Sequence, residues 1–229
     1  MKNSKWRIDL LIIIACSFLI NYIVVKISSN EFGIIAGQII NILGIAGWLV
    51  FGIYRLTEFK KSNKSAFISL LNDKCTVKCI SLAVLIFILS KLSYSFLIEI
   101  EVIRNIDLIS NVLFKPVLLS ADSFYRNRFI IIVIGFFFVL IGVFAEELFF
   151  RGYLFNLQFN FYGKHTWIIN GISWSLIHIF ARANVIALLP TAFLLSWIYQ
   201  RKRNFWIVYG AHLLINAASV YGVIASYRP

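Results

Sequence analysis

Seven long apolar stretches, separated by polar and basic segments, constrain the fold of this chain more than any other feature. An apolar run of about 20 residues is long enough for a helix to cross the hydrocarbon core of a bilayer. The composition agrees, since 60% of the residues are hydrophobic and only 14% are charged. This balance excludes an ordinary soluble domain. The sequence therefore predicts an all-α fold, a polytopic transmembrane helix bundle of about seven spans.

The predicted spans follow the apolar stretches. They cover residues 8–25, 32–54, 79–98, 129–162, 166–180, 185–199 and 204–224. The fourth is too long for one straight crossing, so we expect it to be tilted, or broken near Gly152 or Gly163. We divide the chain into residues 1–128, with the N-terminal spans and a basic cytoplasmic loop, and residues 129–229, whose four spans are expected to enclose a polar cavity.

The basic residues indicate how the chain is oriented. The net charge is +12, but Lys and Arg lie between the spans and do not form one stripe, so we expect no nucleic acid partner. If the N-terminus is cytoplasmic, the cytoplasmic segments hold more Lys and Arg than the outer segments. The positive-inside rule therefore predicts a multi-pass protein of the cell membrane with a cytoplasmic N-terminus.

Residues 145–152 place two carboxylates and an arginine within otherwise uncharged sequence. Ionisable side chains at membrane depth are costly, so they are expected to face the protein interior and to mark a functional site. Glu147 and Arg151 are four residues apart, on one helix face, and can pair. Glu146 lies about 100° around the helix and is left for another partner. A purely structural Glu–Arg pair would have no use for this second carboxylate.

Two histidines lie inside apolar spans, each with a polar or aromatic neighbour one helical turn away. His178 follows Trp174 by four residues, and His212 precedes Asn216 by four. A lone buried histidine is more often a packing residue than a catalyst. Two of them, together with a Glu pair on a third helix, favour a shared site.

The chemistry open to such a set is hydrolysis of an acyl bond. A carboxylate beside an imidazole can activate water as a general base. A histidine and an asparagine amide can donate hydrogen bonds to a developing oxyanion. The sequence contains neither a G-x-S-x-G elbow nor an H-E-x-x-H motif.

Whether a metal takes part stays open at this point. Glu146, His178 and His212 could form a catalytic zinc shell. A zinc site would also need groups that orient each imidazole, and the nearest carboxylate, Glu147, is expected to be committed to Arg151. We therefore favour a reaction without a cofactor and keep zinc as the alternative.

Three motifs in order carry a family resemblance. They are Glu146-Glu147-x-x-x-Arg151, Trp174-x-x-x-His178 and His212-x-x-x-Asn216. They resemble the CPBP family of intramembrane proteases, which includes the type II CAAX prenyl endopeptidases, the abortive-infection proteins and the bacteriocin-processing or self-immunity proteins. The resemblance covers roughly residues 130–219. One departure is Trp174, where the family more often has Phe.

The resemblance implies a role for each motif residue. Glu146 would activate water with the help of His178, while His212 and Asn216 would stabilise the oxyanion. The remaining motif residues would give structural support: Glu147, Arg151 and Trp174. The chain would then be a glutamate-dependent or metal-dependent CAAX-type intramembrane protease, with residues 129–229 as its catalytic core and a peptide or membrane protein as substrate.

The biological role is less constrained. Prenylated substrates imply a eukaryotic set of partners, whereas a composition rich in Ile, Lys and Asn is typical of a bacterial protein. We therefore expect a bacterial protein that acts in peptide maturation or bacteriocin self-immunity. One alternative is a non-catalytic immunity or regulatory protein that binds a peptide or membrane partner. Another, a proton-coupled transporter, is disfavoured because the chain has no second, matching half.

Overall fold

A computed structural model of the protein describes residues 5–27, 31–62, 77–100, 137–178 and 185–226. Within these residues the chain is helical throughout, which confirms the predicted all-α class. Three of the described helices are long and apolar enough to cross a membrane, at Lys5–Val24, Ile42–Phe59 and Val77–Leu97. The start of the predicted fourth span and the boundary between residues 128 and 129 lie outside the described residues.

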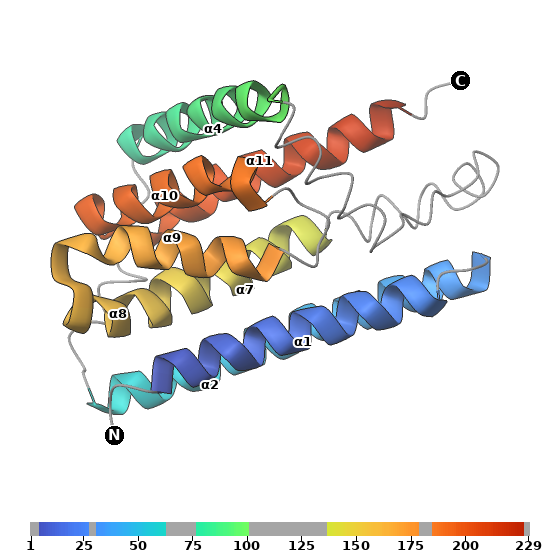
Figure 1. Ribbon diagram of the computed structural model, residues 1–229, viewed down its shortest axis with the longest axis horizontal. Coiled ribbons are helices and arrows are strands. Elements are labelled where there is room, and N and C mark those ends of the chain that lie inside the picture. Colours follow the sequence, from blue (N-terminus) through green and yellow to red (C-terminus); the bar gives the residue numbers. More distant parts are fainter. Residues whose placement is uncertain (1–4, 28–30, 63–76, 101–136, 179–184, 227–229) are drawn as a thin grey trace.

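The N-terminal part contains three long helices. Helices α1 (Lys5–Ile27) and α2 (Glu31–Ser62) pack along each other as an antiparallel pair (Figure 1). Helix α4 (Val77–Ile98) lies on the other side of the bundle, against α10 and α11. Large apolar side chains on the outer faces of α1, α2 and α4 are exposed. Exposed apolar surface of this extent is expected where helices face lipid.

The segment with the Glu-Glu motif is one continuous helical run of four parts. These are η1 (Phe138–Gly142), α7 (Val143–Glu147), η2 (Leu148–Leu154) and α8 (Phe155–Tyr162), with π-helical geometry in η1 and η2. The run ends at Gly163, where φ is +50°, a left-handed value that glycine adopts without strain. The expected break is therefore at Gly163, whereas Gly152 lies inside η2 and does not interrupt the helix.

Three further helices complete the bundle after the short 3₁₀ turn η3 (Gly163–His165). They are α9 (Thr166–Ile177), α10 (Val185–Lys202) and α11 (Phe205–Ser226), close to the predicted spans. Helices α9 and α10 approach closely at Gly171. A Cβ atom there would lie 2.6 Å from Cδ1 of Phe193 and 3.2 Å from the backbone carbon of Ala192. Glycine is needed for this approach, as small residues are in membrane helix packing.

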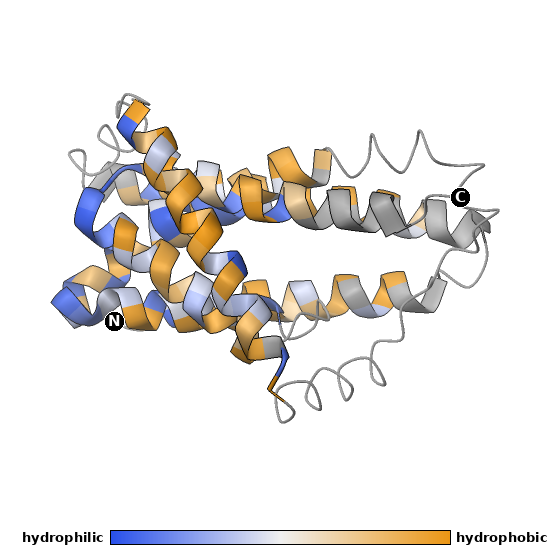
Figure 2. Cartoon of the chain, turned by 90° about the horizontal axis from the view of Figure 1, so that it is seen from above, coloured by the Kyte–Doolittle hydropathy of each residue, from blue (hydrophilic) through white to orange (hydrophobic). Residues whose placement is uncertain are grey.

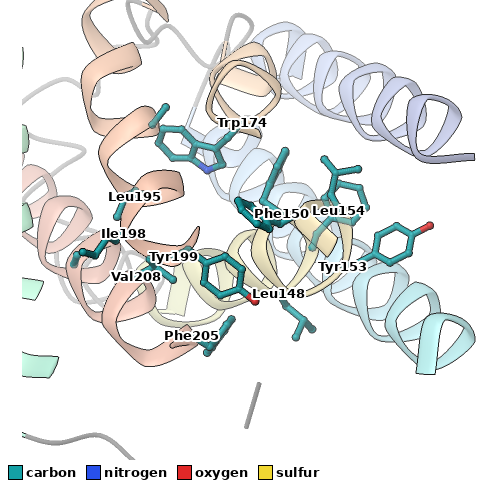
Figure 3. Close-up of a cluster of buried hydrophobic side chains, with 14 of the residues drawn as sticks. Leu148, Phe150, Tyr153, Leu154, Trp174, Leu195, Ile198, Tyr199, Phe205 and Val208 are labelled. Carbon is teal, nitrogen blue, oxygen red and sulfur yellow. The ribbon is translucent and has the colours of Figure 1, made fainter. Parts of the chain in front are cut away.

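The core is built around η2. Its residues Phe149, Phe150 and Leu154 have no exposed surface. Aromatic side chains of α2 pack on it, with Trp48 6.2 Å from Phe149 between ring centroids. Figure 3 shows the opposite side, where Trp174 and residues of α10 and α11 close the cluster. Because η2 is enclosed on these sides, the charged groups beside it face protein and not lipid.

A charged cluster joins the α1–α2 pair to this core. Asp9 of α1 is buried and accepts hydrogen bonds from Arg55 of α2 and from the hydroxyl of Tyr153 in η2. Glu58 of α2 pairs with Arg55 at 2.9 Å and with Lys5 of α1 at 3.1 Å. Figure 2 shows hydrophilic residues gathered at this end of the bundle, where the N-terminus lies.

Candidate active site

Glu147 and Arg151 form the ion pair that their spacing predicts. Nη1 of Arg151 lies 3.0 Å from Oε1 of Glu147, and neither side chain has exposed surface. The same carboxylate oxygen also lies 2.8 Å from Nδ1 of His212 on α11. The expectation that Glu147 is committed to Arg151 alone is therefore wrong. Glu147 connects the motif helix to α11 and orients an imidazole.

Glu146 has a different environment from its neighbour. It lies at the end of α7, and 25% of its side chain is exposed. Its Oε2 accepts a hydrogen bond of 3.1 Å from the indole Nε1 of Trp174. The same oxygen is 3.9 Å from Nε2 of His178, too long for a direct hydrogen bond. A separation of this size suits a bridging water molecule.

The orientation of His178 is set by the backbone. Its Nδ1 lies 3.0 Å from the carbonyl oxygen of Trp174, one turn earlier. A carbonyl only accepts, so Nδ1 carries the proton and Nε2 of the neutral ring has a free lone pair. Since 19% of the His178 side chain is exposed, a water molecule can reach it. The lone pair of His178 and the carboxylate of Glu146 are thus two acceptors at one accessible place.

His212 is almost fully buried, with 3% of its side chain exposed. With Nδ1–H donating to Glu147, Nε2 accepts when the ring is neutral and donates when the ring is protonated. Donation from Nε2 to an oxyanion would therefore require the protonated ring. Asn216, one turn later, donates its amide N–H to the backbone carbonyl of His212 at 3.2 Å. The amide has a second N–H, so this bond does not prevent it from donating to a substrate.

Trp174 lies between the two imidazoles and is 2% exposed. Its ring centroid is 4.4 Å from that of His178 and 5.1 Å from that of His212, the latter edge-on. The guanidinium carbon of Arg151 lies over the ring, 5.5 Å from its centroid. Residues from four elements, α7, η2, α9 and α11, therefore meet around this indole.

Sequence reasoning missed a polar network behind the ion pair. Nη2 of Arg151 lies 3.4 Å from the hydroxyl of Ser196, which donates to Oδ1 of Asn170 at 3.1 Å. Asn170 donates to Gln158, which in turn donates to Ser173. The network satisfies polar groups that have no access to water. Asn170 and Gln158 are amides inside apolar spans, the signal that selected Asn216, and could have been found by it.

The metal alternative can be compared with this arrangement. Both imidazoles have Nδ1 held by an acceptor, Glu147 or the Trp174 carbonyl, as a zinc site would need. However, among the residues that the structure describes, no three His, Cys, Asp or Glu side chains are grouped as ligands of one ion. The two imidazoles are thus oriented as zinc ligands would be, but the possible ligands do not converge on one point.

Comparison with known proteins follows from this geometry. The carboxylates and imidazoles grouped inside this helical bundle are typical of a site for acid–base chemistry within a membrane protein. Residues 128–218 match the family described as Type II CAAX prenyl endopeptidase Rce1-like. The match covers all three motifs and implies a CAAX-type protease in a membrane. No curated protein and no solved structure matches the chain.

Proposed function

We propose that the protein is an intramembrane endopeptidase in which Glu146 activates water. The observation that carries this proposal is the 3.9 Å separation of Oε2 of Glu146 from Nε2 of His178, on side chains that are both partly exposed. The other carboxylate of the motif, Glu147, is fully buried and accepts from two donors, Arg151 and His212. Accessibility thus distinguishes a reacting carboxylate from a structural one.

The reaction assigns a task to each group. A water molecule donates one hydrogen bond to Glu146 and one to His178, and Glu146 takes its proton as the oxygen attacks the peptide carbonyl. Nε2–H of protonated His212 and the amide of Asn216 donate to the oxyanion. When the carbon–nitrogen bond breaks, Glu146 returns the proton to the leaving amine. No step requires a metal ion.

The substrate is a peptide or membrane protein that reaches a site between α7, α9 and α11. We propose a bacterial peptide precursor, cut during peptide maturation or self-immunity, with the composition as support. Whether the substrate carries a prenyl group is open to direct measurement, since two peptides that differ only in an S-farnesyl group can be compared.

The experiment uses the full chain in lipid nanodiscs. Two quenched fluorescent peptides ending in C-a-a-X, one farnesylated and one not, are incubated with the wild type and with Glu146→Gln. In parallel, new protein termini are mapped by mass spectrometry in bacterial cells that express either form. We expect cleavage products that depend on Glu146. If no peptide is cut and no terminus depends on the wild type, the protease proposal is wrong and a non-catalytic binding role takes its place.

A further inference from the structure

Trp174 lies at a position where the family that this chain resembles more often has Phe. Its indole N–H, which Phe lacks, donates a hydrogen bond to Glu146. We propose that Trp174 is a positioning residue that holds the Glu146 carboxylate toward His178 through this N–H. The inference rests on the proposed function, because Trp174 can position Glu146 for catalysis only if Glu146 is the base that activates water.

The hydrogen bond connects two helices. Nε1 of Trp174 on α9 donates to Oε2 of Glu146 on α7, at 3.1 Å. An indole N–H is a donor only, and a bond from it to an ionised carboxylate is charge-assisted and therefore stronger than a neutral one. Since Oε2 is also the oxygen nearest to His178, the bond fixes the end of the carboxylate that faces the imidazole.

The indole itself has little freedom to move. Its face lies under the Arg151 guanidinium, and its ring contacts the rings of His178 and His212. A ring held in this way presents its N–H in one direction. Glu146 is partly exposed, so without this donor its carboxylate would be free to turn toward water. The arrangement converts a mobile carboxylate into an aligned base.

A phenyl ring would keep the aromatic contacts and lose the donor. Trp174→Phe therefore separates the two roles only partly, because it also removes volume. Replacing Trp174 with 3-benzothienylalanine, in which sulfur takes the place of the N–H, keeps the shape and removes the donor alone. Trp167→Phe is the matched control, since Trp167 lies two turns earlier on α9 and packs edge-on against Phe193, 5.8 Å between centroids.

The kinetic test measures kcat and KM on the quenched C-a-a-X peptides in nanodiscs. We expect both changes at Trp174 to lower kcat about tenfold with KM within about twofold, because positioning acts on the chemical step. Trp167→Phe should keep the wild-type kcat. A benzothienyl protein with the wild-type kcat overturns the proposal, as does one in which only KM changes.

A second readout does not depend on activity. In protein labelled with ¹⁵N-tryptophan, the indole N–H resonance of Trp174 is assigned by its loss in Trp174→Phe. We expect Glu146→Gln to shift this resonance and Glu58→Gln, on α2, to leave it unchanged. A resonance that ignores Glu146→Gln overturns the proposed hydrogen bond.

The two readouts separate the failures. If Glu146→Gln abolishes cleavage but the benzothienyl protein retains the full rate, the proposed function stands and the role of Trp174 falls. If the resonance shifts while Glu146→Gln cleaves normally, the contact exists but the proposed function is wrong, and the positioning role falls with it.

Discussion

Nδ1 of His212 and Nη1 of Arg151 both lie within hydrogen-bonding distance of one oxygen of Glu147, at 2.8 Å and 3.0 Å. Two positively polarised donors from different elements thus converge on one buried carboxylate. Helix α11 is held to α7 by the contact between His212 and Glu147. Glu147 consequently has two tasks, because it both neutralises Arg151 and fixes the orientation of His212.

Breaking this contact from one side should destabilise the protein strongly. Glu147→Gln leaves the Arg151 guanidinium charged and without its counter-ion in the interior. Removing one partner of a buried pair costs about 3–5 kcal/mol. We expect a large loss of monodisperse protein after heating in detergent, measured by size-exclusion chromatography.

Removing the charge on both sides provides the control. In Glu147→Gln combined with Arg151→Met, the amide still accepts from His212, and methionine fills most of the arginine volume without a charge. Buried pairs replaced in this way are often close to neutral in stability. We expect the double variant to recover most of the lost yield. A double variant as unstable as Glu147→Gln alone would contradict an ion-pair origin of the effect.

The neighbouring glutamate should respond in the opposite way. Glu146→Gln keeps an oxygen that accepts from Trp174, and the side chain is partly exposed, so we expect a change in unfolding free energy below about 0.5 kcal/mol. Loss of a general base should lower kcat by about 10²–10⁴-fold. Thermal melting and peptide cleavage on the same preparation check both parts. A melting loss as large as that of Glu147→Gln would assign Glu146 to the structure.

The roles of the two ring nitrogens of His212 can be tested separately. In His212→Asn the side-chain amide lies near the position of Nδ1 and can still donate to Glu147. The shorter side chain has no atom at the position of Nε2. We expect nearly normal folded yield and a fall in kcat of about 10²–10³-fold, the effect of losing one oxyanion donor. His212→Leu, which also abandons Glu147, should lose yield as well. Wild-type turnover by a well-folded His212→Asn protein would refute the role of Nε2.

The limits of the sequence prediction have physical causes. The helix predicted at 185–199 extends to Lys202, because a helix continues about one turn into polar residues where its ends reach water. The helix predicted at 32–54 extends to Ser62, and Arg55 and Glu58, which lie beyond its apolar stretch, are paired. Arg55 meets Asp9 of α1, and Glu58 meets Lys5, contacts that hydropathy alone does not reveal.

The site was predictable to the same depth. Spacing of four residues predicts the Glu147–Arg151 pair because both side chains belong to one helix. The bond between Glu147 and His212 joins residues 65 positions apart, so it depends on how α11 packs and has no local signature. The sequence alone shows tryptophan at position 174, where the family it resembles more often has Phe. The role of the indole N–H could be inferred only from the position of Glu146 relative to it.

The charged cluster that joins α1 to the core gives a further prediction. Tyr153→Phe removes a hydrogen bond to the buried carboxylate of Asp9, a loss of about 1.5–3 kcal/mol for a charged acceptor. In an Asp9→Ala background the same change should have little effect, because the acceptor is absent. Tyr54→Phe is the control, since Tyr54 donates to the exposed Glu58, and it should change stability by less than about 0.5 kcal/mol. Additive losses from Asp9→Ala and Tyr153→Phe would mean that the two groups are not coupled.

The last prediction concerns metal. Zinc would require Glu146, His178 and His212 within about 2.0–2.2 Å of one ion. One Glu146 oxygen is already engaged by the Trp174 N–H, and among the described residues no three His, Cys, Asp or Glu side chains are grouped as ligands of one ion. We therefore expect protein washed with chelator to keep its peptide-cleaving activity and to contain far less than one zinc per chain by elemental analysis. Stoichiometric zinc that is lost together with activity, and restored together with it, would overturn this expectation in favour of a metal-dependent protease.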